Sequence, residues 1–187
     1  MVEKVIEAAM DLVQKHGYNA FSYRDLSARV KIKTASIHYY FPKKGDLGEA
    51  LMRRYREAFA QALANIDREA RSVDDKLSRY AGLFERTFQA SEKVCLGGML
   101  ACEFLTLPEP VRSQVKAFFT DNETWLTGVI RTGKEAGVFH TKVRPEVLAT
   151  TVVSALEGAM IAARTFHDPD RLASVGTCIR QLLKGTK

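Results

Sequence analysis

The sequence predicts an all-α protein of about nine helices, and three observations lead to that fold class. Apolar residues recur at the 3.6-residue spacing of amphipathic helices along nearly the whole chain. Capping residues, prolines and glycines separate these periodic segments, as they do at helix ends. No segment shows the alternating pattern of a half-buried strand.

The first three helices are predicted to be short. The first carries an apolar stripe that ends before Gly17 and comprises Val5, Ile6, Ala9, Leu12 and Val13. The second should start after Ser22, because Asp25 three residues later completes a capping box. The third should begin near Thr34 and end at Phe41, because a residue that precedes proline disfavours the helical conformation.

Six longer helices are predicted to follow. Their expected extents are about 46–70, 73–88, 96–107, 111–137, 145–166 and 168–185. Pro145 suits the first turn of the eighth helix, and Asp168 with Pro169 suits the start of the ninth. The change from short basic helices to long apolar ones divides the chain into two predicted domains, residues 1–46 and 47–187, which the fourth helix joins.

Several function classes find no support in the sequence. The N-terminus carries acids and lacks a cleavage site, and no uninterrupted apolar run of about 18 residues occurs, so neither a secretion signal nor a membrane span is expected. Metal-ligand spacings, nucleophile motifs and phosphate loops are also missing, so we expect no metal, no cofactor and no enzymatic activity. Three cysteines without a pairing pattern indicate a reduced, cytoplasmic protein.

Positive charge is concentrated between Ser22 and Lys44, where six basic side chains stand against one acidic side chain. Two short helices joined by a tight turn form a helix-turn-helix, whose second helix, here TASIHYY, can enter the major groove of DNA. Ile37 and Tyr40 are expected to face inward. The residues expected to face DNA are Thr34, Ala35, Ser36, His38 and Tyr39.

Two other interpretations of this segment remain open. The lysines could be a solvated face above core tyrosines, or the basic patch could bind a membrane surface or a protein partner. The capping box, the short helices and the ending Tyr-Tyr-Phe-Pro-Lys-Lys favour the DNA-binding interpretation.

The stretch FSYRDLSARVKIKTASIHYYFPKKGDLGEAL resembles the DNA-binding signature of tetracycline-repressor-type (TetR family) transcriptional regulators. The residues that carry the resemblance are Phe21, Ser22, Asp25, Leu26, Ser36, Ile37, Tyr39, Tyr40, Phe41, Lys44 and Leu47. The number and length of the downstream helices match the family as well. The resemblance implies a homodimeric repressor that binds double-stranded operator DNA, with a C-terminal domain that binds a small-molecule effector and dimerises through its last two helices.

Residue chemistry and the resemblance together place the DNA contacts on Ser22, Lys33, Thr34, Ala35, Ser36, His38, Tyr39, Lys43 and Lys44. The resemblance implies that Tyr39 and Lys44 contact phosphates. Four positions depart from the family's pattern, namely Lys31, Thr34, His38 and Gly45. The family often has glycine at the position of Lys31, where a left-handed turn would cost about 1 kcal/mol.

Aromatic and methionine side chains of the central helices are candidate walls of an effector pocket, although most of them are expected to be core. The candidates, including two acids within apolar helices, are Tyr80, Phe84, Phe88, Met99, Glu103, Phe104, Phe118, Phe119, Trp125, Glu157 and Met160. Either acid could pair with a cationic ligand; a surface position or an internal salt bridge is the simpler alternative.

The eighth helix contains the stretch TTVVSALEGAMIAA, whose small residues let two helices approach closely. The predicted dimer contacts on the last two helices are Val152, Ala155, Leu156, Ala159, Ala163, Val175, Ile179 and Leu182. The two-fold symmetry of such a dimer predicts a pseudo-palindromic operator.

Cys95 and Cys102 offer an alternative kind of effector response. They are seven residues apart and would share a face of a continuous helix, where a thiol near Lys93 could sense oxidants or electrophiles. Gly97 and Gly98 argue against such a continuous helix, and a buried inert cysteine is the simpler interpretation.

Overall fold

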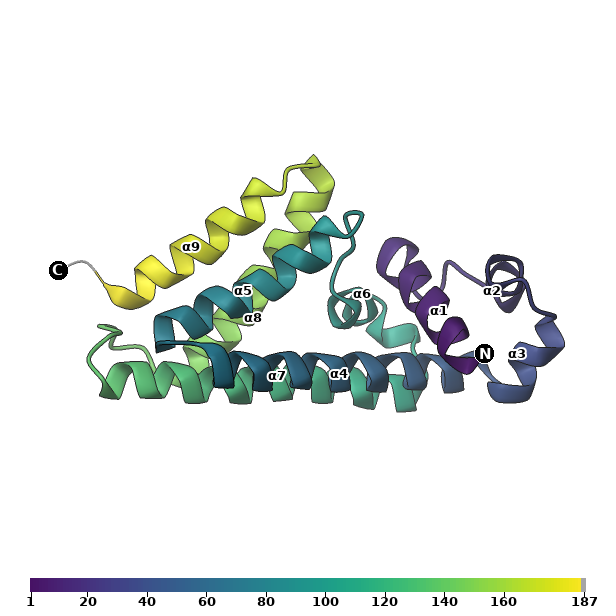
Figure 1. Ribbon diagram of the computed structural model, residues 1–187, viewed down its shortest axis with the longest axis horizontal. Helices are drawn as coiled ribbons and strands as arrows, with labels where there is room; N and C mark the ends of the chain where they lie inside the picture. Colours follow the sequence, from purple (N-terminus) through teal and green to yellow (C-terminus); the bar gives the residue numbers. More distant parts are fainter. Residues whose placement is uncertain (186–187) are drawn as a thin grey trace. The chain divides into compact units, whose positions relative to one another are not determined.

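The computed structural model describes residues 1–185, which form nine α-helices and one 3-10 turn and contain no strand (Figure 1). This result confirms the predicted all-α class. The helices are α1 (Val2–His16), α2 (Tyr23–Val30), α3 (Thr34–Tyr40), α4 (Lys44–Glu69), α5 (Val73–Gln89), α6 (Leu96–Cys102), η1 (Phe104–Thr106), α7 (Glu109–Glu135), α8 (Pro145–Phe166) and α9 (Asp170–Lys184).

Contacts within the chain divide it into two compact units. The first unit comprises Met1–Ala58 and Cys95–Phe118, and the second comprises Phe59–Val94 and the chain from Phe119 onward. The first unit therefore contains α1, α2, α3, α6 and η1, together with the first parts of α4 and α7. Residues 95–118 belong to the same unit as the N-terminal helices, whereas the sequence suggested one division near residue 46.

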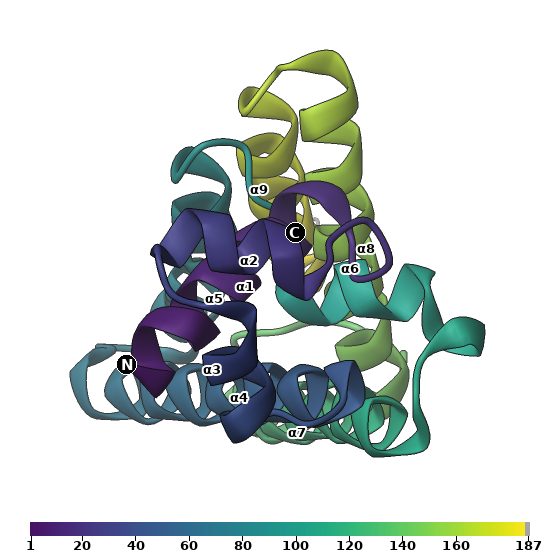
Figure 2. The ribbon, with the colours of Figure 1, turned by 90° about the vertical axis from the view of Figure 1, so that its right-hand side faces the viewer.

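In the first unit, α1 packs through the stripe that its sequence predicts (Figure 2 shows α1, α2 and α3 from the right-hand side of Figure 1). The buried residues of α1 are Val5, Ile6, Ala9, Val13 and Gln14. Gly17 ends the helix with a φ of 95°, a left-handed conformation that glycine adopts without a steric penalty.

The predicted capping box starts α2. The Ser22 hydroxyl accepts a hydrogen bond from the Asp25 amide, and the Asp25 carboxylate accepts one from the Ser22 amide over 2.8 Å. At the other end of the helix, Lys31 is left-handed, with a φ of 56° and a ψ of 44°. The strain expected there is offset locally, because the Ile32 amide and carbonyl both hydrogen-bond to Ser27.

The helix α3 is anchored by one apolar residue, Ile37, which is fully buried. At its end, the Tyr23 hydroxyl of α2 donates to the carbonyls of Phe41 and Lys43, each over 2.9 Å. Tyr40 was expected to face inward, but this prediction is wrong, since 43% of its surface is exposed. A seven-residue helix has only two turns, so one residue and the flanking Phe41 suffice to seat it.

The second unit has a core to which α5, the part of α7 from Phe119 onward, α8 and α9 contribute. Its fully buried side chains include Tyr80, Leu126, Ile130, Leu156 and Met160. Arg180 of α9 donates to Asp74 of α5 over 2.8 Å, and Lys184 donates to the same carboxylate over 2.9 Å. A Cβ at Gly176 would lie 3.1 Å from Ala81, so the absence of a side chain lets α9 approach α5 closely.

Several helix ends differ from the expectation. The helix α4 begins at Lys44 rather than near residue 46, and α7 spans Glu109–Glu135 rather than 111–137. The predicted helix 96–107 ends at Cys102 and continues as the 3-10 turn η1. The helix α9 begins at Asp170 rather than at Pro169, and the Asp168 carboxylate accepts a hydrogen bond from the Asp170 amide over 3.1 Å. Among residues 1–185, only α8 is long and apolar enough to meet a membrane-span criterion, which core helices of soluble proteins also meet.

Candidate nucleic-acid interface

The exposed face of α3 carries most of the residues predicted to contact DNA. Ala35, His38 and Tyr39 are exposed, and 80% of the surface of Tyr39 is accessible. Thr34 and Ser36 are half-buried. The helix therefore presents two methyl groups, two hydroxyls, an imidazole and a phenol, which together can contact base edges and phosphate oxygens.

Two aromatic contacts fix the orientation of the exposed rings. The imidazole of His38 packs edge-on against the Tyr23 ring, with centroids 4.7 Å apart, and its Nδ1 lies 3.4 Å from the Pro42 carbonyl. The rings of Tyr39 and Tyr40 form a second edge-to-face pair, with centroids 5.1 Å apart. Such pairing restricts the rotamers of both rings before any ligand binds.

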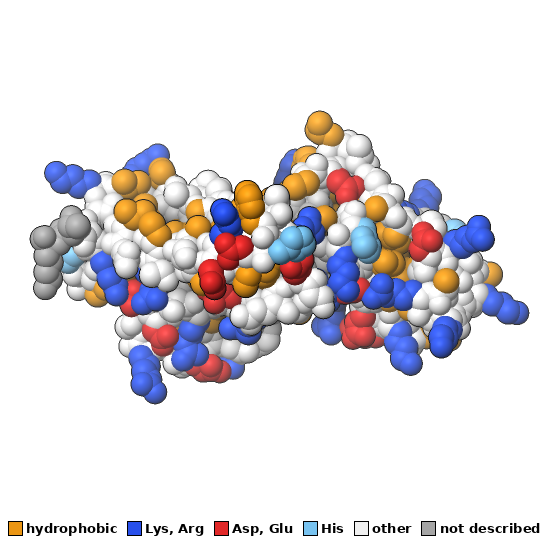
Figure 3. Space-filling model, turned by 90° about the horizontal axis from the view of Figure 1, so that it is seen from above, with side chains coloured by type: hydrophobic (Ala, Val, Ile, Leu, Met, Phe, Trp, Pro, Cys, Tyr) orange, Lys and Arg blue, Asp and Glu red, His pale blue; other side chains and the backbone are white. Residues whose placement is uncertain are grey.

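Cationic side chains surround this face. Lys and Arg side chains stand out around α2 and α3, at the right of Figure 3. Four of the six basic residues between Ser22 and Lys44 are exposed and make no ion pair within residues 1–185, namely Arg24, Lys31, Lys33 and Lys43. Exposed cations of this kind attract a polyanion and release its counterions when it binds.

The other two basic residues are already engaged. Arg29 pairs with the Asp11 carboxylate of α1. Lys44 is half-buried, and its ammonium donates to the carbonyls of Tyr18, over 2.6 Å, and Phe21. Burial lowers the pKa of Lys44, and the charges of Glu103 and Asp25 oppose that shift. The implied phosphate contact of Lys44 stays a prediction, but these carbonyl contacts favour a structural role.

Ser22 also has an internal role. It is exposed, yet its hydroxyl donates to the Asp25 carboxylate over 2.7 Å within the capping box. Its position beside the start of α2 still allows the DNA contact that the sequence predicts.

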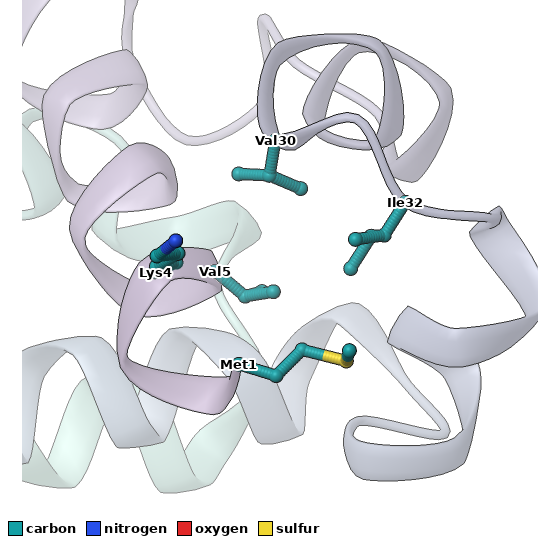
Figure 4. A pocket seen from close by; sticks show the side chains of 5 residues that line it. All are labelled: Met1, Lys4, Val5, Val30 and Ile32. Carbon is teal, nitrogen blue, oxygen red and sulfur yellow. The ribbon is translucent and has the colours of Figure 1, made fainter.

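A cavity of about 270 Å³ lies near this region in the first unit, lined by Met1, Lys4, Val5, Val30 and Ile32 (Figure 4). Its walls come from α1, from the end of α2 and from the turn that follows. None of the predicted effector residues lines it, so it gives no support to an effector assignment.

The predicted effector residues are divided between the two units. Those in the first unit are Met99, Glu103, Phe104 and Phe118, and those in the second are Tyr80, Phe84, Phe88, Phe119, Trp125, Glu157 and Met160. Within the second unit, Trp125 stacks on Tyr80 at 5.5 Å, and the Tyr80 hydroxyl donates to Asn122 over 2.8 Å. Glu157 is buried, with 8% of its surface exposed. The effector role of these residues stays a prediction.

Sequence reasoning missed two residues that contact the Tyr80 side chain, Phe59 and Asn122. Phe59 packs edge-on against Tyr80 and Phe84, with centroids 6.2 Å from each. Asn122 is buried, with 1% of its surface exposed, inside an otherwise apolar stripe of α7. The sequence did carry a signal for Asn122. A single asparagine at a core position of a helix indicates a buried hydrogen bond, because a buried side-chain amide requires a partner.

The predicted dimer residues of α8 require a correction. Four of them are buried within the second unit and cannot form an outer surface of the subunit, namely Val152, Leu156, Ala159 and Ala163. Ala155, Val175 and Ile179 are half-buried, and Leu182 is 72% exposed. The exposed side of α8 is a different stripe, which comprises Val147, Thr151, Ser154, Gly158, Ile161 and Thr165.

The two cysteines lie in different environments. Cys95 is 1% exposed and immediately precedes α6, with the Tyr55 hydroxyl 3.5 Å from its sulfur. Cys102 is exposed at the last position of the helix. Among residues 1–185, no group of three potential metal ligands comes together.

An all-α chain with a capped helix-turn-helix and an exposed, cation-flanked second helix defines a helix-turn-helix regulator. Residues 5–51 match the family described as bacterial regulatory proteins, tetR family, and residues 75–179 match the tetracyclin repressor-like C-terminal domain. The chain therefore belongs to the TetR family of transcriptional regulators. Regulators of this family are not enzymes, which confirms that part of the sequence prediction.

Solved structures and a characterised relative agree with this assignment. A TetR regulator from Legionella pneumophila is 35% identical, with a TM-score of 0.89 over 97% of this chain and 96% of that one. A regulator from Agrobacterium tumefaciens is 29% identical, with a TM-score of 0.95 over 98% and 97%. The biofilm operon negative regulator IcaR of Staphylococcus epidermidis is 28% identical over 130 residues. The matched region covers 67% of this chain and 65% of that protein.

Proposed function

We propose that the protein is a homodimeric repressor that places α3 of each subunit in the major groove of a pseudo-palindromic operator. The observation that carries this proposal is the exposed face of α3 with four exposed cations around it. Tyr39, His38 and Ala35 are available for contacts with the groove and the backbone, and the lysines supply affinity that does not depend on sequence. Such a protein acts in the cytoplasm, where the chromosome is accessible.

The dimer is proposed to form through the exposed stripe of α8, together with α9. Residues 147, 151, 154, 158, 161 and 165 recur at alternating spacings of four and three, which places them along one side of the helix. A Cβ at Gly158 would meet no atom within 4 Å, so a second helix has room to approach there. Ile161, 42% exposed, supplies apolar area on the same side.

Release from DNA by a small-molecule effector is also proposed. The aromatic cluster of the second unit, which comprises Phe59, Tyr80, Phe84 and Trp125, is a candidate wall for an apolar ligand. The alternative response through Cys95 and Cys102 has weaker support, because Cys95 is buried. An electrophile that modifies Cys102 without releasing DNA would exclude that alternative.

A binding experiment at two salt concentrations tests the proposed DNA binding. The protein is titrated into labelled random-sequence duplex at about 50 and 200 mM salt, where several phosphate contacts change the affinity by a factor on the order of 10³ or more. Steep salt dependence supports the proposal. Affinity that is independent of salt, or no binding at the lower concentration, would contradict it.

A further inference from the structure

The corner between α1 and α2 is held by a residue from a distant part of the first unit. The Glu103 carboxylate accepts a hydrogen bond from the Tyr18 amide over 2.7 Å and another from the Asn19 amide over 2.9 Å. Glu103 directly follows α6, and 85 residues separate it from Tyr18 along the chain. Both carboxylate oxygens are therefore used to bind two successive backbone amides.

The neighbourhood of this contact is shaped to fit it. A Cβ on Gly17 would lie 2.3 Å from the Glu103 Oε1 atom, so the carboxylate can approach only because residue 17 has no side chain. The Asn19 side chain donates to the Thr106 hydroxyl over 2.9 Å, which adds a third hydrogen bond between the corner and the segment from Glu103 to Thr106. Hydrogen bonds to a carboxylate are shorter and stronger than those between neutral groups.

A continuous set of contacts leads from Glu103 to the recognition helix. The corner runs directly into Ser22, the N-cap of α2. Tyr23, the residue after Ser22, donates hydrogen bonds from its hydroxyl to the carbonyls of Phe41 and Lys43, just after the end of α3. Every contact in this path lies within the first unit.

We propose that Glu103 is a positioning residue for DNA binding, which holds the α1–α2 corner and thereby keeps α2 and α3 in the arrangement that fits the operator. This inference rests on the proposed function. Without the carboxylate, two amides at the corner lose their partner, and the helix-turn-helix samples orientations that do not fit the groove. The apparent affinity falls by the fraction of molecules that leave the competent arrangement.

The direction in which Glu103→Gln changes DNA affinity distinguishes a positioning role from a purely electrostatic effect of the lost charge. Loss of a negative charge from a basic DNA-binding protein should by itself strengthen binding to DNA. If Glu103 holds the corner, Glu103→Gln should instead weaken operator binding. The NH₂ group of the glutamine side chain is a donor, and it would face one of the two backbone amides, which are donors too. The matched control is Glu109→Gln, which removes the same charge from the surface of α7, where Glu109 pairs with Arg112 over 2.6 Å.

The test uses the full-length protein and a duplex selected by the wild type from a random-sequence pool. We expect Glu103→Gln to bind this duplex at least about tenfold more weakly than Glu109→Gln, at equal concentrations of folded protein. The glutamine side chain keeps one acceptor oxygen, so hydrogen exchange should show that at least one of the Tyr18 and Asn19 amides has lost protection in Glu103→Gln, and that neither has lost it in Glu109→Gln. Thr106→Val leaves the Glu103 carboxylate in place but removes the acceptor of the Asn19 side chain and the hydroxyl that donates to the Glu103 carbonyl over 2.9 Å. It should cause a smaller loss of about two- to fivefold.

Two results would overturn the inference, and they differ from failure of the proposed function. If the wild type selects a duplex and Glu103→Gln binds it as tightly as Glu109→Gln or more tightly, Glu103 is not a positioning residue. Unchanged exchange of both amides has the same meaning, even if affinity falls. If the wild type enriches no duplex at all, the proposed function fails and the inference fails with it.

Discussion

The ammonium of Lys44 donates a hydrogen bond to the Tyr18 carbonyl over 2.6 Å and lies 4.7 Å from the centroid of the Tyr18 ring. It also lies 4.3 Å from the centroid of the Phe21 ring. The adjacent Lys43 is exposed, and its side chain makes no contact of this kind within residues 1–185. Two neighbouring lysines thus differ in environment, and the difference predicts different roles.

Substitution of each lysine by alanine should separate a phosphate contact from a structural contact. Lys43→Ala should lower the slope of log affinity against log salt by about 0.9, the value expected for one phosphate contact, with no loss of thermal stability. Lys44→Ala should leave the slope unchanged, weaken binding at every salt concentration and lower the melting temperature, because it removes two hydrogen bonds and two cation–π contacts. A slope reduced by about one in Lys44→Ala would restore the phosphate role implied by the family resemblance.

Tyr39 should contribute to operator binding without contributing to folding. Its surface is 80% exposed, so Tyr39→Ala should change the free energy of unfolding by less than about 0.5 kcal/mol. The same change should abolish tight operator binding and leave the dimer intact, as sedimentation and gel shift can measure. Tyr39→Phe keeps the ring and removes only the hydroxyl, so an intermediate loss would assign part of the effect to a phosphate hydrogen bond. Wild-type affinity in Tyr39→Ala would refute the contact.

The exposed stripe of α8 should form the dimer contact. Ile161→Glu places a charge on the proposed interface and should produce a folded monomer with much weaker operator binding, because a dimer binds two half-sites. Leu105→Glu is the matched control, since Leu105 is an apolar residue with 91% exposure in the first unit. Analytical ultracentrifugation distinguishes the two variants. A dimer that persists in Ile161→Glu would move the interface elsewhere.

Acid should weaken the link between α5 and α9. The Arg180 guanidinium holds the pKa of Asp74 below its usual value of 3.8, with Lys184 acting in the same direction and partial burial opposing both. A carboxyl whose pKa is lower in the folded state stabilises the protein fully above pH 3.8 and loses that contribution as pH falls through the folded-state pKa. Asp74→Asn should reduce stability at pH 7 by up to about 1 kcal/mol and flatten its acid dependence.

Urea unfolding at pH 7 and below pH 3.8 measures this contribution. Arg180→Gln should flatten the acid dependence in the same way, since it removes the main partner of Asp74. If both variants retain the wild-type dependence on pH, the pair does not contribute to acid stability.

The fold and the exposed face of α3 could be predicted from the sequence because their signals are local. The capping box of Ser22 and Asp25 and the buried Ile37 depend on neighbours within a few residues, and the structure confirms both. The left-handed conformation of Lys31 was left open by the sequence, because a lysine there is strained, and it is a finding of the structure. Periodicity and capping suffice for such features.

Contacts between distant residues could not be predicted in the same way. Glu103 is one acid in an apolar segment, and nothing in its spacing indicates that it binds amides near residue 18. The sequence also could not show which side of α8 faces the core. Ala159 and Gly158 are adjacent small residues, yet the first is buried and the second is exposed. Such choices depend on how helices pack against each other.

Selection of bound duplexes from a random-sequence pool, followed by measurement of stoichiometry and salt dependence, tests whether the protein binds DNA through α3 as a two-fold dimer. A dimer of this kind should enrich a pseudo-palindrome whose half-sites lie about one helical turn or a multiple apart, with two subunits per duplex and affinity that falls steeply with salt. Retention of no sequence above the random background, or one subunit bound per site, would contradict this mode of binding.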